Sequence, residues 1–350
     1  MNKAILFLLL VGASLMGCGN QEERQPLDIA FYHWQQRLVP DSLNQRLLEM
    51  SSEPLLFTKV CDLAWEQDRV VPRAVLAVAA GQLNYQLQPV VFITNEVMIE
   101  LGKLPDTEVQ LQQLAVDLLG LIDRSLVGHT PYRELQIDCD WTRGSANTYF
   151  RFLEILQEQL PAATSLSVTV RLHQWRDYKT QAVPPVKRGI LMAYNSGDLQ
   201  QWATENSILD TSISAAYLQA VDYPLPLDVA LPLYQWGALY RQGGLAYLMN
   251  DLDAAELVDS SRFRLLSEGR YQVKRGTYLR SIYCYSGDLI RLESSDPDRL
   301  QATARQLQVV PYFEGQRLLF FRQGGQLATQ VDSSFLQRLA DGGPGLLEPK

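Results

Sequence analysis

The segment ELQIDCDWTRGSANTYFRFLEILQEQLPAATSLSVTVRL, residues 134–172, decides the fold of this chain. Residues 134–141 and 165–172 are short runs rich in apolar and β-branched side chains, which is typical of strands. Between them, residues 146–159 carry apolar side chains at helical spacing. Two strands joined by one helix are parallel and are connected by a right-handed crossover. The segment therefore predicts one βαβ unit.

The same alternation continues in both directions along the chain. Further strands are predicted at residues 27–34, 54–65, 88–96, 188–195, 228–234 and 317–322. Helices are predicted from residue 41 onward and at residues 105–122, 213–220 and 298–307. Eight such units close into a (β/α)8 barrel of the TIM type, so we predict an α/β fold of this class. An open doubly wound sheet is the alternative, but no Gly-x-Gly-x-x-Gly sequence follows any predicted strand.

Residues 267–293 interrupt this alternation with short strand-like runs that Gly276 and Gly287 divide. We predict a small β-hairpin insertion there, before the last unit of a barrel that spans residues 27–325. Residues 326–350 are expected to form a C-terminal tail with a frayed end. The composition, with 47% hydrophobic and 20% charged residues, is that of an ordinary globular protein and excludes a disordered or fibrous chain.

The first residues have the layout of a bacterial lipoprotein signal. Lys3 precedes an apolar run too short to cross a membrane as a helix, and Leu15-Met16-Gly17-Cys18 resembles the lipobox. We predict a signal peptide at residues 1–17, a lipid on Cys18 and a tether over residues 18–26, with an uncleaved anchor as the alternative. No Asp follows Cys18, which resembles lipoproteins of the outer membrane. The expected location is the cell envelope, on the periplasmic or surface face.

Charge and cysteine content exclude several classes of function. The formal net charge is -8, with 31 basic and 39 acidic residues and no long basic run, which argues against nucleic acid as a partner. Besides Cys18, the chain has Cys61, Cys139 and Cys284, and this odd number argues against a disulfide framework, although one bridged pair stays open. No metal-ligand spacing or phosphate-binding glycine motif is present, so neither a metal nor a cofactor is expected.

Two aspartates in the segment quoted first are the leading catalytic candidates. Side chains alternate along a strand, so Asp138 and Asp140 share one face, opposite to Ile137 and Cys139. In a barrel the apolar face packs under the helices, and both carboxylates then point inward near the carboxyl end of the strand, where barrel enzymes have their active sites. Their repulsion would raise one pKa, which suits a general acid. Arg171 on the next strand would instead neutralise the pair in a structural network, and both hypotheses stay open.

Other polar and aromatic side chains follow the predicted strands and would surround the same end of the barrel. A saccharide cleft needs aromatic platforms beside carboxylates and amides, because sugars present apolar ring faces and a belt of hydroxyl groups. If Asp140 donates the proton, Asp138 would tune its pKa. The opposing carboxylate would come from one of three acids, Glu96, Asp62 or Asp228. The candidates for substrate binding are His33, Trp34, Asp62, Arg171, His173, Tyr194, Asn195, Asp228 and Trp236.

The fourth and sixth predicted strands resemble the barrel of family 18 glycoside hydrolases, the chitinase group. Asp138 and Asp140 match the last two aspartates of the Asp-x-x-Asp-x-Asp-x-Glu motif of that family, and Met192-Ala193-Tyr194-Asn195 resembles its Met-x-Tyr-Asp motif. The glutamate that serves the family as general acid falls at Thr142, and the sixth-strand aspartate is replaced by asparagine. The chain is also similar to a family of bacterial lipoproteins of unassigned function.

These resemblances imply a glycosidase-like barrel and leave two functions from different classes. The first is an envelope lipoprotein that binds a polysaccharide or glycan and hydrolyses it by carboxylate acid–base chemistry. The second is an inactive barrel that binds carbohydrate or takes part in envelope assembly, and Thr142 at the position of the acid keeps it open. A deacetylase or lyase on the same barrel is a third hypothesis. The expected partners are a glycan and, through Cys18, the membrane.

Overall fold

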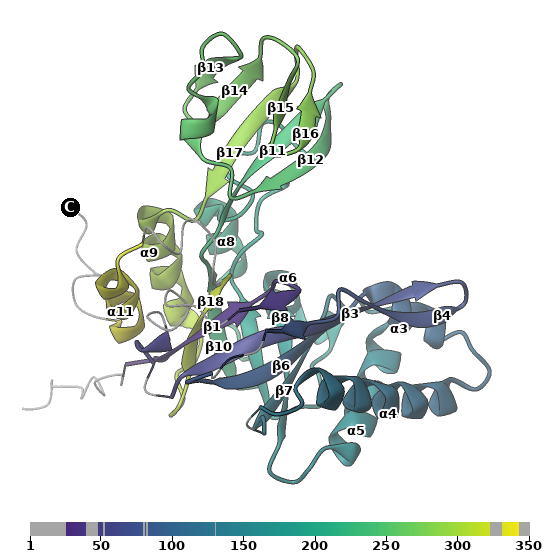
Figure 1. The fold of residues 1–350 in the computed structure, drawn as a ribbon. Helices are drawn as coiled ribbons and strands as arrows, with labels where there is room; N and C mark the ends of the chain where they lie inside the picture. Colours follow the sequence, from purple (N-terminus) through teal and green to yellow (C-terminus); the bar gives the residue numbers. More distant parts are fainter. Residues whose placement is uncertain are drawn as a thin grey trace, which may run out of the picture.

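The structure is a computed structural model that describes residues 26–39, 48–51, 53–79, 81, 83–129, 131–322 and 331–342. Eight parallel strands form a closed barrel, which confirms the predicted (β/α)8 fold (Figure 1). The barrel strands are β1 (Asp28–His33), β3 (Leu55–Glu66), β6 (Gln86–Ile93), β7 (Glu134–Cys139), β8 (Ser165–Arg171), β9 (Arg188–Met192), β10 (Leu227–Pro232) and β18 (Arg317–Phe321). Because β1 pairs in parallel with both β18 and β3, the sheet closes on itself.

Helices connect most of the barrel strands and cover the outside of the barrel (Figure 1). They are α3 (Asn95–Leu101), α4 (Thr107–Ser125), α5 (Ala146–Gln159), α6 (Leu172–Arg176), α7 (Tyr178–Gln181), α8 (Thr211–Tyr217), α9 (Pro297–Gln306) with the 3-10 turn η3 (Leu307–Val309), and α11 (Ser333–Asp341). The bounds of α5 are those predicted. The predicted signal peptide, Cys18 and most of the helix expected from residue 41 lie outside the described residues.

Two short segments differ from the sequence prediction near the carboxyl ends of strands. The strand predicted at residues 88–96 ends at Ile93, and the next residues begin α3, because Val97, Met98 and Leu101 bury one helical face. The segment around Pro72, where no strand was predicted, forms β4 (Arg69–Arg73), which pairs antiparallel with β3. Proline is tolerated there because β4 is the edge strand of the sheet.

Two minor strands lie in the connections after β1 and β3. They are β2 (Arg37–Leu38) and β5 (Ala77–Val78), which pair in parallel. No helix occurs between β3 and β6 among the residues that the structure describes. None of the described helices is long and apolar enough to cross a membrane.

The insertion before the last barrel unit is present but larger than predicted. It begins at residue 235 rather than 267 and ends at residue 294. A five-stranded antiparallel sheet joins β12 (Gly244–Asn250), β11 (Gln235–Arg241), β17 (Leu289–Ser294), β14 (Arg270–Val273) and β13 (Phe263–Ser267). The 3-10 turn η2 (Ala254–Leu257) and a hairpin of β15 (Thr277–Leu279) and β16 (Ile282–Cys284) complete it. The insertion has a hydrophobic core of its own and stands off the barrel in Figure 1.

The predicted C-terminal tail contains a packed helix, α11, which supplies the helix of the eighth unit. Leu336 and Leu339 are buried, and the backbone N–H of Leu27 donates to the carbonyl of Ala340 at 3.0 Å. Apolar residues three apart on a short helix are enough to dock it on the barrel. The barrel therefore extends to Asp341 and does not end at residue 325.

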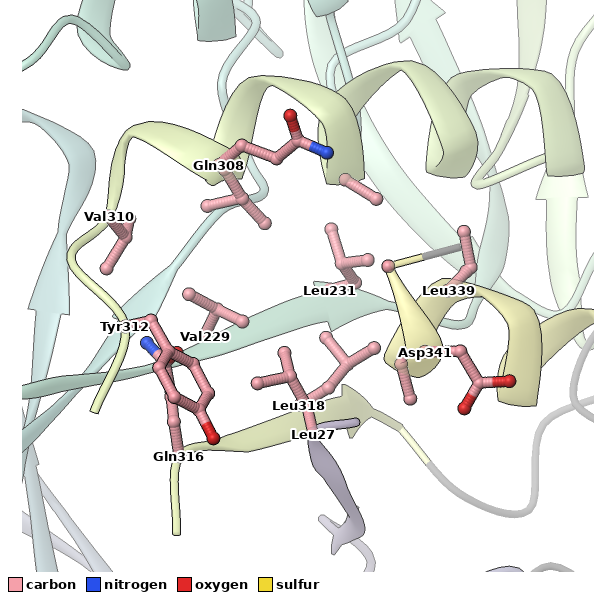
Figure 2. Close-up of a pocket in the computed structure, with 14 residues that line it drawn as sticks. Leu27, Val229, Leu231, Gln308, Val310, Tyr312, Gln316, Leu318, Leu339 and Asp341 are labelled. Carbon is pink, nitrogen blue, oxygen red and sulfur yellow. The ribbon is translucent and has the colours of Figure 1, made fainter. Parts of the chain in front are cut away.

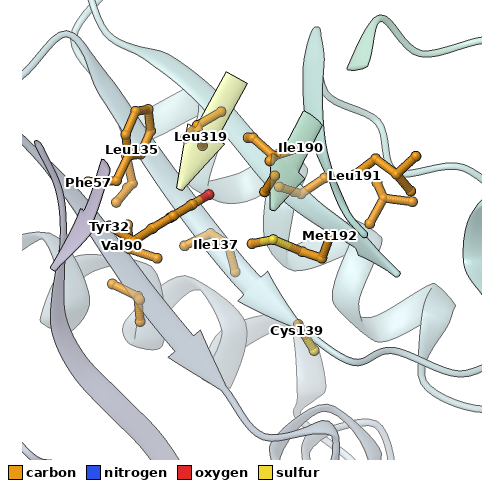
Figure 3. Packing of buried hydrophobic residues seen from close by; sticks show 14 of the residues in the cluster. Tyr32, Phe57, Val90, Leu135, Ile137, Cys139, Ile190, Leu191, Met192 and Leu319 are labelled. Atoms are coloured by element: carbon orange, nitrogen blue, oxygen red, sulfur yellow. The ribbon is translucent and has the colours of Figure 1, made fainter. Parts of the chain in front are cut away.

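Side chains from all eight strands fill the inside of the barrel, so it is a packed core. Figure 3 shows the ring of Tyr32 directed toward the centre, where its hydroxyl group donates to Gln136 Oε1 at 2.7 Å. At the amino end of the barrel, Arg317 is ion-paired with Glu134 at 2.7 Å and with Asp228 at 2.5 Å. The three cysteines Cys61, Cys139 and Cys284 are buried and free. The opposite end, where the strands terminate, is called the barrel mouth below.

Candidate functional site at the barrel mouth

The two aspartates of the β7 segment lie at different depths. Only 4% of Asp138 is exposed, and Thr169 Oγ1 donates a hydrogen bond to its Oδ1 at 2.6 Å. Asp140 follows the last residue of β7, and 49% of its side chain is exposed. Because Asp138 contacts an inward-facing residue of β8, the carboxylates lie on the interior side, as predicted. Only Asp140 reaches solvent.

Arg171, the last residue of β8, joins the two aspartates. Its Nε and Nη2 atoms donate hydrogen bonds to the Asp140 carboxylate, and its Nη2 atom lies 3.9 Å from Asp138 Oδ1. Burial alone would lower the pKa of Arg171, but Asp138 and Asp140 raise it above its ordinary value, so the guanidinium group stays charged. The ion-pair network that the sequence left open is therefore present, and it holds Asp140 at the mouth as the partner of a cation.

The carboxyl group of Asp138 has a raised pKa. Burial raises the pKa of Asp138, while the charge of Arg171 and the hydrogen bond from Thr169 offset part of this effect. The nearby charges of Asp140 and Asp62 add to the increase. We predicted from the sequence that Asp138 would tune the pKa of Asp140, whereas in the structure the pKa of Asp138 itself is raised.

Replacing Asp138 by asparagine is expected to change how stability depends on pH. An aspartate with a raised folded-state pKa contributes stability that is fully present below its unfolded pKa of about 3.9 and is lost as the pH rises through the folded pKa. Asparagine can still accept the Thr169 hydrogen bond but does not titrate. In denaturant unfolding across this pH window, the wild type should lose stability relative to Asp138→Asn as the pH rises. A constant difference between the two proteins would contradict the assignment.

A hollow with a volume of about 390 Å³ opens at the barrel mouth beside the Asp140–Arg171 pair. We call it the mouth hollow, and it is lined by Asp140, Arg171, Leu172, His173, Tyr194, Asn195, Ser196 and Tyr217. Five predicted site residues are among these. The volume lies within the range of small-molecule sites, about 300–1,000 Å³. The ends of β7, β8 and β9 therefore meet as predicted and enclose a space that a ligand can enter.

The walls of the mouth hollow offer several kinds of hydrogen-bonding group. Burial lowers the pKa of His173, so at neutral pH its imidazole is uncharged and can both donate and accept. Asn195 has a left-handed backbone with φ of 54°, and its N–H donates to the carbonyl of Ile208 at 2.7 Å. The hydroxyl group of Tyr234 donates to Asn195 Oδ1 at 2.6 Å and so fixes the amide. The hollow thus combines an ion pair, an imidazole and an oriented amide.

An aromatic cluster of Trp34, Tyr194, Tyr234, Trp236 and Phe321 adjoins the mouth hollow through Tyr194. Tyr194 stacks on Phe321, with ring centroids 5.3 Å apart, and Trp34 contacts Phe321 edge-on at 5.1 Å. Tyr234 contacts the rings of Tyr194, Trp236 and Phe321. The sequence predicts three members of the cluster and misses Tyr234 and Phe321. Phe321 could have been predicted from the alternation of side chains along its strand, because it shares a strand face with the inward-pointing Arg317.

Asp62 reaches the barrel interior through an irregularity in β3. The register between β3 and β6 shifts between Lys59 and Cys61, which moves the following residues to the other face. Asp62 is ion-paired with Lys59 at 2.8 Å, and Lys59 Nζ lies 5.2 Å from the centroid of the Trp34 ring. Trp34 and Asp62 are therefore connected through Lys59, but neither of them lines the mouth hollow.

Two predicted substrate-binding residues do not belong to the mouth. Asp228 is the second residue of β10 and is fully buried in the ion pairs with Arg317 and Arg188. A side chain at the start of a strand lies at the amino end of the barrel, which corrects its predicted place at the mouth. His33 lies on the face of β1 opposite to Tyr32 and is 4% exposed, so it packs outside the barrel interior.

Glu96, the predicted catalytic partner, is exposed in the first turn of α3. Glu96 is not among the residues that line the mouth hollow. The predicted strand included Glu96, but β6 ends at Ile93, which changes the direction of the chain before this residue. Glu96 therefore lies on a helix rather than on the predicted strand, and its pairing with an aspartate stays a prediction.

A second, smaller cavity lies outside the barrel, between α9, α11 and the strands β10 and β18 (Figure 2). Its volume is about 90 Å³, and Val229, Leu231, Leu318 and Leu339 contribute to its lining. In Figure 2, Val229, Leu231 and Leu318 line this gap from the sheet, and Leu339 lines it from α11. Because its walls are largely aliphatic and it is far smaller than the mouth hollow, we regard it as a packing gap.

Comparison with solved structures finds a similar barrel in several bacterial proteins. The chain is similar to the spore cortex-lytic enzyme SleL of Bacillus megaterium QM B1551, with a TM-score of 0.53 and 11% identity over 91% of this chain and 75% of that chain. SleL of Bacillus cereus gives a TM-score of 0.51 and 10% identity over the same shares. The C-terminal domain of a candidate chitinase from Desulfitobacterium hafniense DCB-2 gives 0.54 and 13%, over 91% of this chain and 99% of that domain.

No protein-family model and no curated protein sequence matches the chain. At identities this low, the structural likeness establishes the fold and leaves the chemistry to be argued from the site. The fold is a (β/α)8 barrel similar to the barrels of these three structures.

Proposed function

We propose that the barrel mouth binds a saccharide and does not cleave it. The observation that carries this proposal is the mouth hollow itself, where the Asp140–Arg171 pair, His173 and Asn195 surround a space next to an aromatic cluster. Charged and amide groups hydrogen-bond sugar hydroxyls, and aromatic rings stack on the apolar faces of sugars. The similarity to glycoside-hydrolase-like barrels supports the same class of ligand.

The arrangement of the acids argues against hydrolysis. Glycoside cleavage needs a group that protonates the leaving oxygen, and most glycoside hydrolases add a second carboxylate on the other side of the bond. Asp140 is held by Arg171, and Glu96 does not line the mouth hollow. Thr142 is exposed in the turn that starts α5, where its N–H donates to Ser145 Oγ at 3.0 Å. A threonine hydroxyl group cannot serve as the acid near neutral pH.

A hydrolase is the second candidate, and one observation favours it. The raised pKa of Asp138 is a property of general acids, and this carboxyl group lies next to Arg171 of the mouth hollow. A proton that Asp138 gives to a substrate in the mouth hollow would have to pass Asp140. If this candidate is correct, products should form and should disappear in the Asp138→Asn protein.

We also propose that the protein acts in the cell envelope, held there by a lipid on Cys18. The lipobox-like sequence supports this proposal, and the tether of residues 18–26 would keep the barrel close to the membrane surface. A glycan bound at the mouth would then be an envelope or extracellular polymer. Metabolic labelling with a palmitate analogue should mark the wild type and not Cys18→Ser.

Binding by the barrel mouth is tested with isothermal titration of the purified protein against chitohexaose, cellohexaose and a peptidoglycan glycan fragment. We expect at least one of these oligosaccharides to bind, and Asp140→Ala to weaken that binding by about tenfold or more, the effect of losing a central polar contact. Arg151→Ala, which removes an exposed ion pair on α5, is the matched control and should bind as the wild type does.

Product analysis of the same mixtures separates the two candidates. We expect no new reducing ends after prolonged incubation. Reducing ends that depend on Asp138 would establish the hydrolase instead. Binding that is unchanged in Asp140→Ala would contradict the proposal that the mouth hollow is the site.

A further inference from the structure

The β15–β16 hairpin of the insertion has two faces of opposite character. Leu279 and Cys284 point into the core of the insertion and are buried. The other face carries Tyr278, which is 68% exposed, and Tyr283, which is 40% exposed. These two tyrosines are cross-strand partners, with ring centroids 5.1 Å apart, and Tyr285 continues the row 4.9 Å from Tyr283. A strand face that is exposed to solvent is ordinarily polar, so three adjacent exposed aromatic rings indicate an interaction surface.

A fourth ring and an arginine extend this surface onto β12 and β11. The guanidinium carbon of Arg241 lies 4.5 Å from the Tyr285 ring centroid and 5.9 Å from that of Tyr247, which is 48% exposed. We call Tyr247, Tyr278, Tyr283, Tyr285 and Arg241 the tyrosine patch. Its members come from four different strands and from position 285, just after the hairpin, so the fold of the insertion is what brings them together.

The patch is held in place before any ligand arrives. Asp288, itself buried, accepts hydrogen bonds from Arg241 Nη2 at 2.8 Å and from Arg241 Nε at 3.1 Å. Arg241 Nη2 also donates to the carbonyl of Tyr283 at 3.1 Å. A Cβ atom at Gly276 would lie 2.3 Å from the Tyr283 hydroxyl oxygen, so only glycine lets the ring rest there. Rings fixed in this way lose little conformational entropy on binding.

The chemistry of the patch favours a neutral saccharide over other occupants. Residues 235–294 contain eight basic and seven acidic side chains, whereas the whole chain has a net charge of -8, so the insertion is nearly neutral. Nucleic acid and anionic lipid surfaces select strongly basic sites, and Arg241 is already neutralised by Asp288. Tyrosine presents a ring face for the C–H groups of a sugar and a hydroxyl group for its oxygens.

We propose that the tyrosine patch is a second saccharide-binding surface, separate from the mouth hollow. No residue of the patch lines the mouth hollow. Two sites on one chain allow it to hold a long polymer at two points, which raises the effective affinity through the second, intramolecular contact. The inference extends the proposed function and does not depend on it, since the patch binds sugar whether or not the mouth does.

The test is retention of the purified protein on insoluble chitin, cellulose and peptidoglycan. We expect the wild type to be retained on at least one polymer, and Tyr278→Ala/Tyr283→Ala to be retained at least tenfold less. Tyr285→Ala alone should show a smaller loss in the same direction. Leu265→Ala/Leu266→Ala removes two exposed apolar side chains from β13 of the same insertion and should behave as the wild type does. Thermal unfolding of each variant checks that it is folded.

The experiments distinguish failure of the tyrosine-patch proposal from failure of the proposal that the mouth hollow binds a saccharide. The patch proposal is overturned if the wild type is retained on none of the three polymers, or if the double tyrosine variant is retained as well as the wild type. It is also overturned if sedimentation shows that the tyrosine substitutions abolish self-association of the chain and leave retention unchanged. Titration of chitohexaose with the double tyrosine variant and with Asp140→Ala reports on the mouth separately.

Discussion

Replacing Arg317 by methionine is expected to lower the free energy of unfolding by about 3–5 kcal/mol, the cost of leaving buried charges without their partner. Arg317 is the centre of the ion-pair cluster at the amino end of the barrel. Its side chain is 7% exposed, and it holds Glu134 at 2.7 Å and Asp228 at 2.5 Å. Burial alone would lower the pKa of Arg317, but Asp228 and Glu134 raise it above its ordinary value, so the cation persists there.

Methionine fills most of the volume of Arg317 but leaves two buried carboxylates facing each other. Arg188 would remain beside Asp228 at 3.3 Å, but among the described residues no second ion pair would hold Glu134. Urea unfolding followed by circular dichroism measures the effect. Arg151→Met is the control, because its ion pair with Glu108 is between exposed side chains and should change stability little. Equal stability of Arg317→Met and the wild type would show that the cluster is not a structural element.

Replacing Glu293 by leucine is expected to have a comparable effect, about 3–5 kcal/mol, at the junction between the barrel and the insertion. Glu293 lies on β17 with a fully buried side chain and forms an ion pair with the equally buried Arg291. Its Oε2 atom accepts a hydrogen bond from the N–H of Ser207 at 3.0 Å and one from Trp236 Nε1 at 2.9 Å. One carboxylate therefore ties β17, β11 and the loop after β9 together.

The double variant Arg291→Leu/Glu293→Leu separates the effect of an unpaired buried charge from the effect of the lost Glu293 hydrogen bonds. Removing both charges leaves no unpaired ion, so we expect it to recover part of the stability that Glu293→Leu loses. Because the insertion has a core of its own, its unfolding can be followed separately by hydrogen exchange of β11 and β17. A double variant that is less stable than the single one would contradict the view that the unpaired Arg291 causes the loss.

The fold could be predicted because each barrel strand is a short apolar run between turn residues, and this signal is local. All eight predicted barrel strands occur, and α5 has its predicted bounds. The extent of the insertion could not be predicted in the same way, because β11 continues directly from the apolar run of β10. A strand that leaves the barrel and a strand that stays in it have the same alternation, and only tertiary pairing separates them.

The site could be predicted in part. Asp140, Arg171, His173, Tyr194 and Asn195 meet because the carboxyl ends of neighbouring parallel strands lie together, a rule that needs only the order of the strands. The predicted position of Asp228 at the mouth was wrong because this residue is at the start of β10, and the start of a barrel strand lies at the amino end of the barrel. The bulge that turns Asp62 inward has no signal in the local sequence. The prediction placed Glu96 on a strand, but β6 ends three residues earlier, at Ile93.

The most direct test of the account is a crystal structure of the protein with chitohexaose or the tightest-binding oligosaccharide. The account predicts a sugar ring inside the mouth hollow, within hydrogen-bond distance of Asp140 and His173, with its glycosidic bonds intact. A saccharide ordered only elsewhere on the chain, or a hollow that stays empty at saturating sugar, would contradict the claim that the barrel mouth is the binding site.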